Sequence, residues 1–105
     1  MMGESKNEGK IVVTVDPKFK DRMPKFLQSR QKDAKEMDES VKQGDYPSIK
    51  MQGGMIKKSS ETFGLEDLKN LGQALETAAN LKDSGKIKEL IQEYSDYVSK
   101  LEIQC

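Results

Sequence analysis

The sequence predicts an all-α protein: an up-down-up-down antiparallel four-helix bundle with an N-terminal extension that contains a short helix and a possible short strand. Apolar residues recur at three- and four-residue spacing in four stretches of the 105 residues, as in amphipathic helices. Short segments rich in glycine and aspartate separate these stretches, and short connections make consecutive helices antiparallel. A chain of this length supports one domain with a modest core.

The N-terminal extension is predicted from a change of composition near residue 10. Residues 1–10 are polar and charged, so we expect a disordered tail that precedes a bundle domain over residues 11–105. Residues 11–15 are a β-branched cluster typical of a strand. A lone strand is not stable, and residues 101–104, which alternate apolar and polar, are a possible partner. An extended arm packed on the bundle is an equal alternative.

The first long helix is expected to follow a short one. Asp16 and Pro17 match an N-cap and a first-turn proline, and they open a short helix to about Met23. Pro24 disfavours helix at the residue before it, so we expect a kink or a restart there. Gly44 supplies a left-handed stop. The predicted inner face of the long helix consists of Leu27, Arg30, Ala34, Met37 and Val41.

The second helix is expected to start at Asp45, which can act as its N-cap, with Pro47 tolerated in the first turn. Its predicted inner face consists of Ile49, Gln52 or Gly53, Ile56, Ser60 and Phe63. Lys50, Gly54, Lys57 and Lys58 fall on or near the outer face. This outer face therefore points to solvent or to a partner.

The third and fourth helices are predicted by the same spacing, with a break at residues 83–85. Glu66 and Asp67 lie in the first turn of the third helix, where the helix dipole favours acidic residues. Its apolar stripe consists of Leu65, Leu68, Leu71, Leu75, Ala78 and Ala79. The stripe of the last helix consists of Ile87, Leu90, Ile91, Tyr94, Val98 and Leu101.

Composition narrows the possible partners and cofactors. The chain has 18 basic and 18 acidic residues, so no net field attracts nucleic acid or anionic lipid, and we expect a protein partner. The only cysteine is Cys105 and there is no histidine, so we expect neither an internal disulfide nor a zinc site, and no cofactor. No apolar run approaches about 20 residues and no signal core is present, which predicts a cytoplasmic protein.

Residues 44–64, GDYPSIKMQGGMIKKSSETFG, resemble the core of histidine-containing phosphotransfer (HPt) domains. In that family a GD(Y/F) helix start is followed by a GH-x-(L/M/I)-K-G-S run and an aromatic-glycine exit. The matching run here extends from Gly53 to Ser59, and Phe63-Gly64 matches the exit. The family's third helix, L-x-x-L-G-x-x-L-E-x-A-A, is similar to residues 65–68 and 71–79. The resemblance covers roughly residues 11–103, because residues 15–17 and 23–33 also resemble the lead-in of one bacterial subgroup, and it implies the same four-helix bundle.

The resemblance also implies that the phosphotransfer chemistry has been lost. The phosphorylated histidine of the family falls on Gly54, and the family's following glycine falls on Lys58. Phosphotransfer needs a nucleophile near neutral pH, and glycine has none. Ser59 and Ser60 would need an activating base. Lys57 matches the family lysine that gives electrostatic support to the phosphoryl group, whereas Lys58 would crowd a docking receiver domain or contact its acidic pocket.

The leading hypothesis is therefore an HPt-like adaptor or competitor that binds a receiver domain or a histidine kinase without accepting phosphate. The predicted partner-binding residues are Lys50, Gly54, Met55, Lys57 and Lys58. The alternative is a structural or oligomerising helical module, for which Met51 and Met55 are candidate contact residues. An enzyme is not expected, because the carboxylates lie beside lysines with no apolar pocket to raise a pKa.

Overall fold

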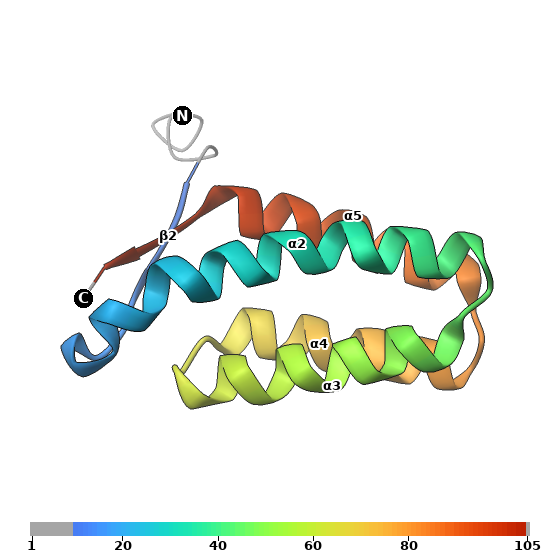
Figure 1. Cartoon of the computed structure of the whole chain (residues 1–105), viewed down its shortest axis with the longest axis horizontal. Helices are drawn as coiled ribbons and strands as arrows, with labels where there is room; N and C mark the ends of the chain where they lie inside the picture. The colour runs from blue at the N-terminus through green and yellow to red at the C-terminus, as the bar shows by residue number, and fades with distance from the viewer. Residues whose placement is uncertain (1–9, 105) are drawn as a thin grey trace, which may run out of the picture.

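A computed structural model of the chain describes residues 10–104 and confirms the all-α four-helix bundle (Figure 1). The element order is β1 (Ile11–Thr14), the 3-10 helix η1 (Pro17–Arg22), α2 (Met23–Lys42), α3 (Tyr46–Thr62), α4 (Glu66–Asn80), α5 (Ser84–Lys100) and β2 (Leu101–Gln104). Consecutive long helices run in opposite directions along the long axis. The predicted tail lies outside the described residues except for Lys10, which pairs with Glu102 at 3.3 Å; Cys105 also lies outside them.

The connections between the long helices share one backbone arrangement. Gly44, Gly64 and Lys82 follow α2, α3 and α4, and have positive φ angles of 69°, 73° and 53°. In each case the next amide donates to a carbonyl five residues earlier, which closes a Schellman motif. The three bonds are Asp45 N to Ser40 O at 2.8 Å, Leu65 N to Ser60 O at 2.9 Å and Asp83 N to Ala78 O at 3.1 Å. The predicted stop at Gly44 is confirmed.

Two aspartates begin the helices that follow these motifs. Asp45 accepts a hydrogen bond from the amide of Ser48 at 3.3 Å, and Asp83 accepts one from the amide of Lys86 at 3.1 Å. These bonds satisfy amides that have no partner within the helix. Leu65 occupies the same position before α4 and makes no capping bond, because a leucine side chain has no polar atom; it is buried in the core instead.

The start of α2 and the end of α3 differ in detail from the sequence prediction. The expected short helix is a 3-10 helix, and α2 restarts directly after it with Pro24 in its first turn. Phe63 was expected on the inner face of α3, but it follows the last helical residue. There its ring packs edge-on against the rings of Phe19 and Phe26, with distances between ring centroids of 4.9 Å and 5.1 Å. The end of α3 is thus fixed by an aromatic cluster.

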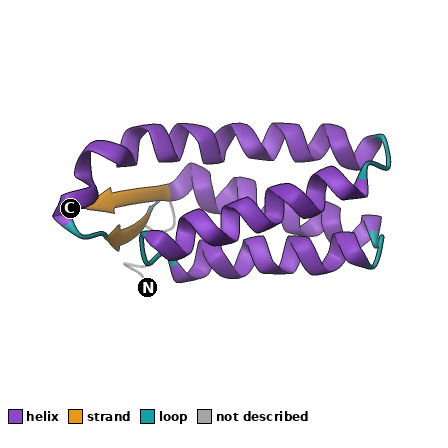
Figure 2. Ribbon diagram, turned by 60° about the horizontal axis from the view of Figure 1, so that its bottom comes forward, coloured by secondary structure: helices purple, strands orange, loops and turns teal. Residues whose placement is uncertain are grey.

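The two strands form a small parallel sheet at one end of the bundle (Figure 2). Ile11 pairs with Leu101 and Thr14 with Gln104, and the amide of Val15 donates to the carbonyl of Gln104 at 2.8 Å. The possible pairing of residues 11–15 with residues 101–104 is therefore realised. Leu101, expected on the last helix, begins β2 instead, where it stays buried.

The core is built mainly from the residues that the helical spacing predicted. Fully buried members of the predicted stripes are Met37, Ile49, Ile56, Ser60, Leu68, Leu75, Ile87, Tyr94 and Val98. Two stripe positions of the first and third helices, Leu27 and Leu71, are only partly buried. Phe26 takes the buried position next to Leu27.

A polar network crosses this core. Arg30 donates to the Asp33 carboxylate at 2.7 Å and to the Ser59 hydroxyl at 2.8 Å, and the Tyr94 hydroxyl donates to the Arg30 carbonyl at 2.8 Å. The network links α2, α3 and α5. Burial raises the pKa of Asp33 even though the Arg30 charge lowers it. Burial, and then the charge of Asp33, also raises the pKa of Tyr94.

Candidate docking site on helix α3

A glycine-to-glycine contact fixes how α3 lies on α4. A Cβ built on Gly53 would lie 2.8 Å from the Gly72 carbonyl oxygen, and one built on Gly72 would lie 2.7 Å from the Gly53 carbonyl oxygen. Side chains essentially never make such short contacts with backbone, so both positions require glycine. The contact brings the two helix axes close together and sets which residues of α4 face α3.

Gly54, the next residue, lines a shallow groove on the outer face of α3. The groove has a volume of 490 Å³ and is lined by Pro47, Lys50, Met51, Gly54, Met55, Lys57, Lys58 and Glu76. The side chains of Met51 and Met55 are 62% and 55% exposed, among the most exposed large apolar residues described. Flexible methionines are well suited to a surface that adapts to a partner.

The groove has space for a side chain at residue 54. A Cβ built on Gly54 would meet only the Glu76 Oε2 atom, at 3.5 Å, which is ordinary van der Waals contact. Glycine is therefore not required there by packing, in contrast to Gly53. The position that the resemblance assigns to the phosphorylated histidine thus has space for a side chain but carries no reactive group.

The three lysines of the groove have different surroundings. Lys57 is held against α4 by hydrogen bonds to Gln73 at 2.9 Å and to Glu76 at 3.2 Å. Lys50 and Lys58 are exposed, and neither forms an ion pair within residues 10–104. The groove thus offers two uncompensated positive charges to a partner, whereas the charge of Lys57 is largely balanced.

The two serines beside the groove have no base to activate them. The Ser59 hydroxyl accepts from the Arg30 guanidinium at 2.8 Å and donates to the Met55 carbonyl at 2.9 Å. A guanidinium donates only and cannot remove a proton. Ser60 is fully buried, and its hydroxyl has no hydrogen-bond partner within the described part of the chain. What this face presents is charged side chains and exposed apolar surface.

All five residues predicted for partner binding line this one groove. Two further residues line the groove that the sequence does not predict for partner binding: Glu76, which borders the groove from α4, and Pro47. That Glu76 borders the groove follows only from the packing of α3 on α4. The contact between Gly53 and Gly72 determines which residues of α4 lie beside Gly54. Pro47 was considered solely as a first-turn residue, although the helical period puts it on the same face as Lys50 and Gly54.

Neither a metal-binding cluster nor a membrane-spanning helix occurs in the described part of the chain. Among residues 10–104, no three His, Cys, Asp or Glu side chains are grouped so as to hold a metal ion. None of the helices in this range combines the length and apolar character needed to cross a membrane.

Comparison of the chain with protein-family models, with curated proteins and with solved structures gives no match.

Proposed function

We propose that this protein is a cytoplasmic HPt-like signalling adaptor or competitor, which binds a receiver domain or a histidine kinase through the α3 groove and cannot carry phosphate on histidine. The observation that carries the proposal is the groove at Gly54. Four residues of the HPt-like run, Gly54, Met55, Lys57 and Lys58, line one open hollow, with glycine where the reactive side chain of the family lies.

The charge and shape of the groove support a protein partner with an acidic surface. Lys50 and Lys58 supply uncompensated positive charge, and charge complementarity guides association and fixes orientation. Met51 and Met55 supply exposed apolar surface between them. Binding energy concentrates on a few buried apolar anchors, so loss of one histidine leaves such a surface functional.

Affinity capture from the native lysate, with identification of the retained proteins, tests the proposal. Receiver-domain proteins or histidine kinases should be enriched on the unaltered chain and reduced on a Lys58→Glu variant. Lys88→Glu, an equal charge reversal on α5, is the matched control and should capture as the unaltered chain does. Retention of these proteins by all three chains, or by none, would contradict the proposal.

Phosphate transfer is measured separately with a phosphorylated receiver domain as donor. The unaltered chain should take up no acid-labile phosphate, because it lacks an imidazole. The Gly54→His, Lys58→Gly double variant should be accommodated, since the space at residue 54 is open. Uptake by the double variant would support the relation to phosphotransfer domains, whereas uptake by the unaltered chain would contradict the proposal.

A second candidate is a module that associates with itself, favoured by the two exposed methionines on one face of α3. In that case sedimentation equilibrium would show concentration-dependent oligomers. A Met51→Gln, Met55→Gln variant would then remain monomeric.

A further inference from the structure

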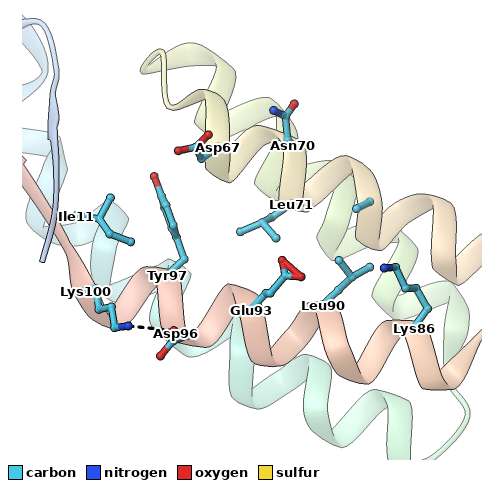
Figure 3. Close-up of a pocket in the computed structure, with 11 residues that line it drawn as sticks. Ile11, Asp67, Asn70, Leu71, Lys86, Leu90, Glu93, Asp96, Tyr97 and Lys100 are labelled. Atoms are coloured by element: carbon cyan, nitrogen blue, oxygen red, sulfur yellow. Dashed lines mark hydrogen bonds and ion pairs between the residues drawn. The ribbon is translucent and has the colours of Figure 1, made fainter. Parts of the chain in front are cut away.

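A second groove lies between α4 and α5, and it shares no lining residue with the α3 groove (Figure 3). Its volume is 610 Å³, and its apolar lining comes from Leu71 and Ala74 on α4 and from Leu90 and the ring of Tyr97 on α5. Ile11 of β1 lies at one end. The groove is thus an elongated apolar hollow between two helices.

The charges around this groove leave an acidic excess. Asp67 on α4 and Glu93 on α5 line it from opposite sides, and neither forms an ion pair within residues 10–104. Of the two lysines of the lining, Lys100 pairs with Asp96 of the same lining at 3.2 Å, whereas Lys86 makes only an exposed contact of 3.9 Å with Glu89, which lies outside the lining. The lining therefore carries three acidic and two basic side chains, and Asp67 and Glu93 are the acidic ones that form no ion pair within residues 10–104.

The hydroxyl of Tyr97 lies in the same negatively charged environment. This hydroxyl points toward Asp67 (Figure 3). Burial, and secondly the negative charge of Asp67, raise the pKa of Tyr97. The electrostatic effect of Asp67 therefore extends into the groove, where a positive group could offset it.

The dimensions of the groove favour a helix as its occupant. The lining residues of α5 extend from Lys86 to Lys100, which corresponds to roughly 21 Å along a helix axis. That length matches about 14 residues of a helix laid in the groove. A helix with one apolar face flanked by basic residues would satisfy both the apolar lining and the two carboxylates, in the helix-in-groove manner of recognition.

We propose that the α4–α5 groove is a second docking surface, which binds a basic amphipathic helix of a partner protein. Apolar side chains of that helix pack against Leu71 and Leu90, and its lysines or arginines reach Asp67 and Glu93. The α3 groove has the opposite charge, so the two surfaces select different partners. A second copy of this chain fits less well: the α3 face of one molecule in the α4–α5 groove of the next forms a head-to-tail contact that does not close into a dimer.

The probe for this proposal is a fluorescein-labelled helical peptide of about 14 residues, a length that matches the groove, with leucines on one face and lysines beside them. Its control has glutamate at every lysine position. Fluorescence anisotropy with the full chain should show saturable binding of the basic peptide, weakened by added salt because the charges are exposed. The acidic peptide should not bind.

An Asp67→Asn, Glu93→Gln variant should weaken binding of the basic peptide roughly tenfold, since it removes two charge contacts. Asp21→Asn, Glu39→Gln changes the net charge equally at exposed positions outside the groove and should leave the affinity unchanged. Circular dichroism establishes that both variants are folded. Amide chemical-shift changes should centre on residues 67–74 and 86–97.

Several outcomes overturn the proposal. It fails if the basic peptide does not saturate, if both double variants weaken binding equally, or if the shift changes centre on α3. Self-association of the unaltered chain that is lost in Asp67→Asn, Glu93→Gln would assign the groove to a second copy instead. None of these results depends on whether the α3 groove binds a receiver domain, so the two proposals fail separately.

Discussion

Gly53 and Gly54 are neighbours in sequence but have opposite packing requirements. A Cβ on Gly53 would lie 2.8 Å from backbone of α4, whereas a Cβ on Gly54 would meet only the end of the flexible Glu76 side chain at 3.5 Å. Both residues lie in the interior of α3. Glycine destabilises the helix at both positions because of its conformational entropy, but only at Gly53 does the missing side chain allow close packing.

We therefore predict opposite effects of alanine at the two positions. Gly53→Ala should destabilise the protein by about 1–3 kcal/mol, because α3 and α4 must move apart. Gly54→Ala should stabilise it by about 0.5–1 kcal/mol through helix propensity. Urea unfolding followed by circular dichroism measures both. Equal effects of the same sign would show that the glycine contact does not set the spacing of α3 and α4.

The site residues that could be predicted from sequence are those on one helix. Helical period alone places Lys50, Gly54 and Lys57 on one face of α3, and the structure brings them into one groove. Glu76 could not be predicted, because its position beside Gly54 depends on how far α4 is shifted along α3. Local spacing does not determine that shift; the contact of Gly53 with Gly72 does.

At the scale of the helix and its ends, Lys82 occupies a position that glycine takes elsewhere in the chain. Gly44 and Gly64 hold the left-handed residue of the first two connections, and Lys82 holds it in the third, at φ 53°. An L-residue with a Cβ is strained in this conformation. The sequence showed a break at residues 83–85 but no glycine at residue 82, so this strained cap was not predicted.

Lys82→Gly should stabilise the protein by about 0.5–1 kcal/mol, since glycine adopts this conformation without the Cβ clash. Lys82→Ala removes the long side chain but keeps the Cβ, and it should change the free energy of unfolding by less than about 0.5 kcal/mol. Thermal unfolding measures the stability of both variants relative to the unaltered chain. A gain in both variants would assign the effect to the lysine side chain and not to the backbone.

The polar network that joins α2, α3 and α5 makes stability depend on pH through Asp33. Its folded pKa is raised above the ordinary 3.8, so the folded state binds the Asp33 proton more tightly than the unfolded state does. The stabilisation from this group is complete below the ordinary pKa and is lost as the pH rises through the folded pKa.

Asp33→Asn should remove this dependence. Relative to Asp33→Asn, the unaltered chain should be most stable near the acidic end of the folded range and should lose its relative stability as the pH rises above the ordinary aspartate pKa. Urea unfolding of both proteins across that pH range gives the difference. A relative stability that rises with pH would mean that the Arg30 charge outweighs burial at Asp33.

At the scale of the whole molecule, the four-helix bundle could be predicted from the sequence, but the pairing of the two terminal strands could not. Four amphipathic stripes and short connections determine an antiparallel arrangement, and the helices lie as expected. The pairing of residues 11–14 with residues 101–104 was one of two equal alternatives. Strand pairing between the two ends depends on where the bundle brings them, and only the assembled helices determine that.

The whole molecule carries two grooves of opposite charge on different helices. Within residues 10–104, Lys50 and Lys58 of the α3 groove and Asp67 and Glu93 of the α4–α5 groove form no ion pair. The balanced total of 18 basic and 18 acidic residues conceals this separation. Net charge alone therefore cannot locate a charged docking surface.

The most direct test of the central proposal is a calorimetric titration of the unaltered chain with isolated receiver domains from the same proteome. We predict saturable one-to-one binding to at least one of them, weakened by Lys58→Glu and unaffected by Lys88→Glu, without transfer of phosphate. Absence of binding of the unaltered chain to every receiver domain, or equal binding by the Lys58→Glu variant, would contradict this proposal.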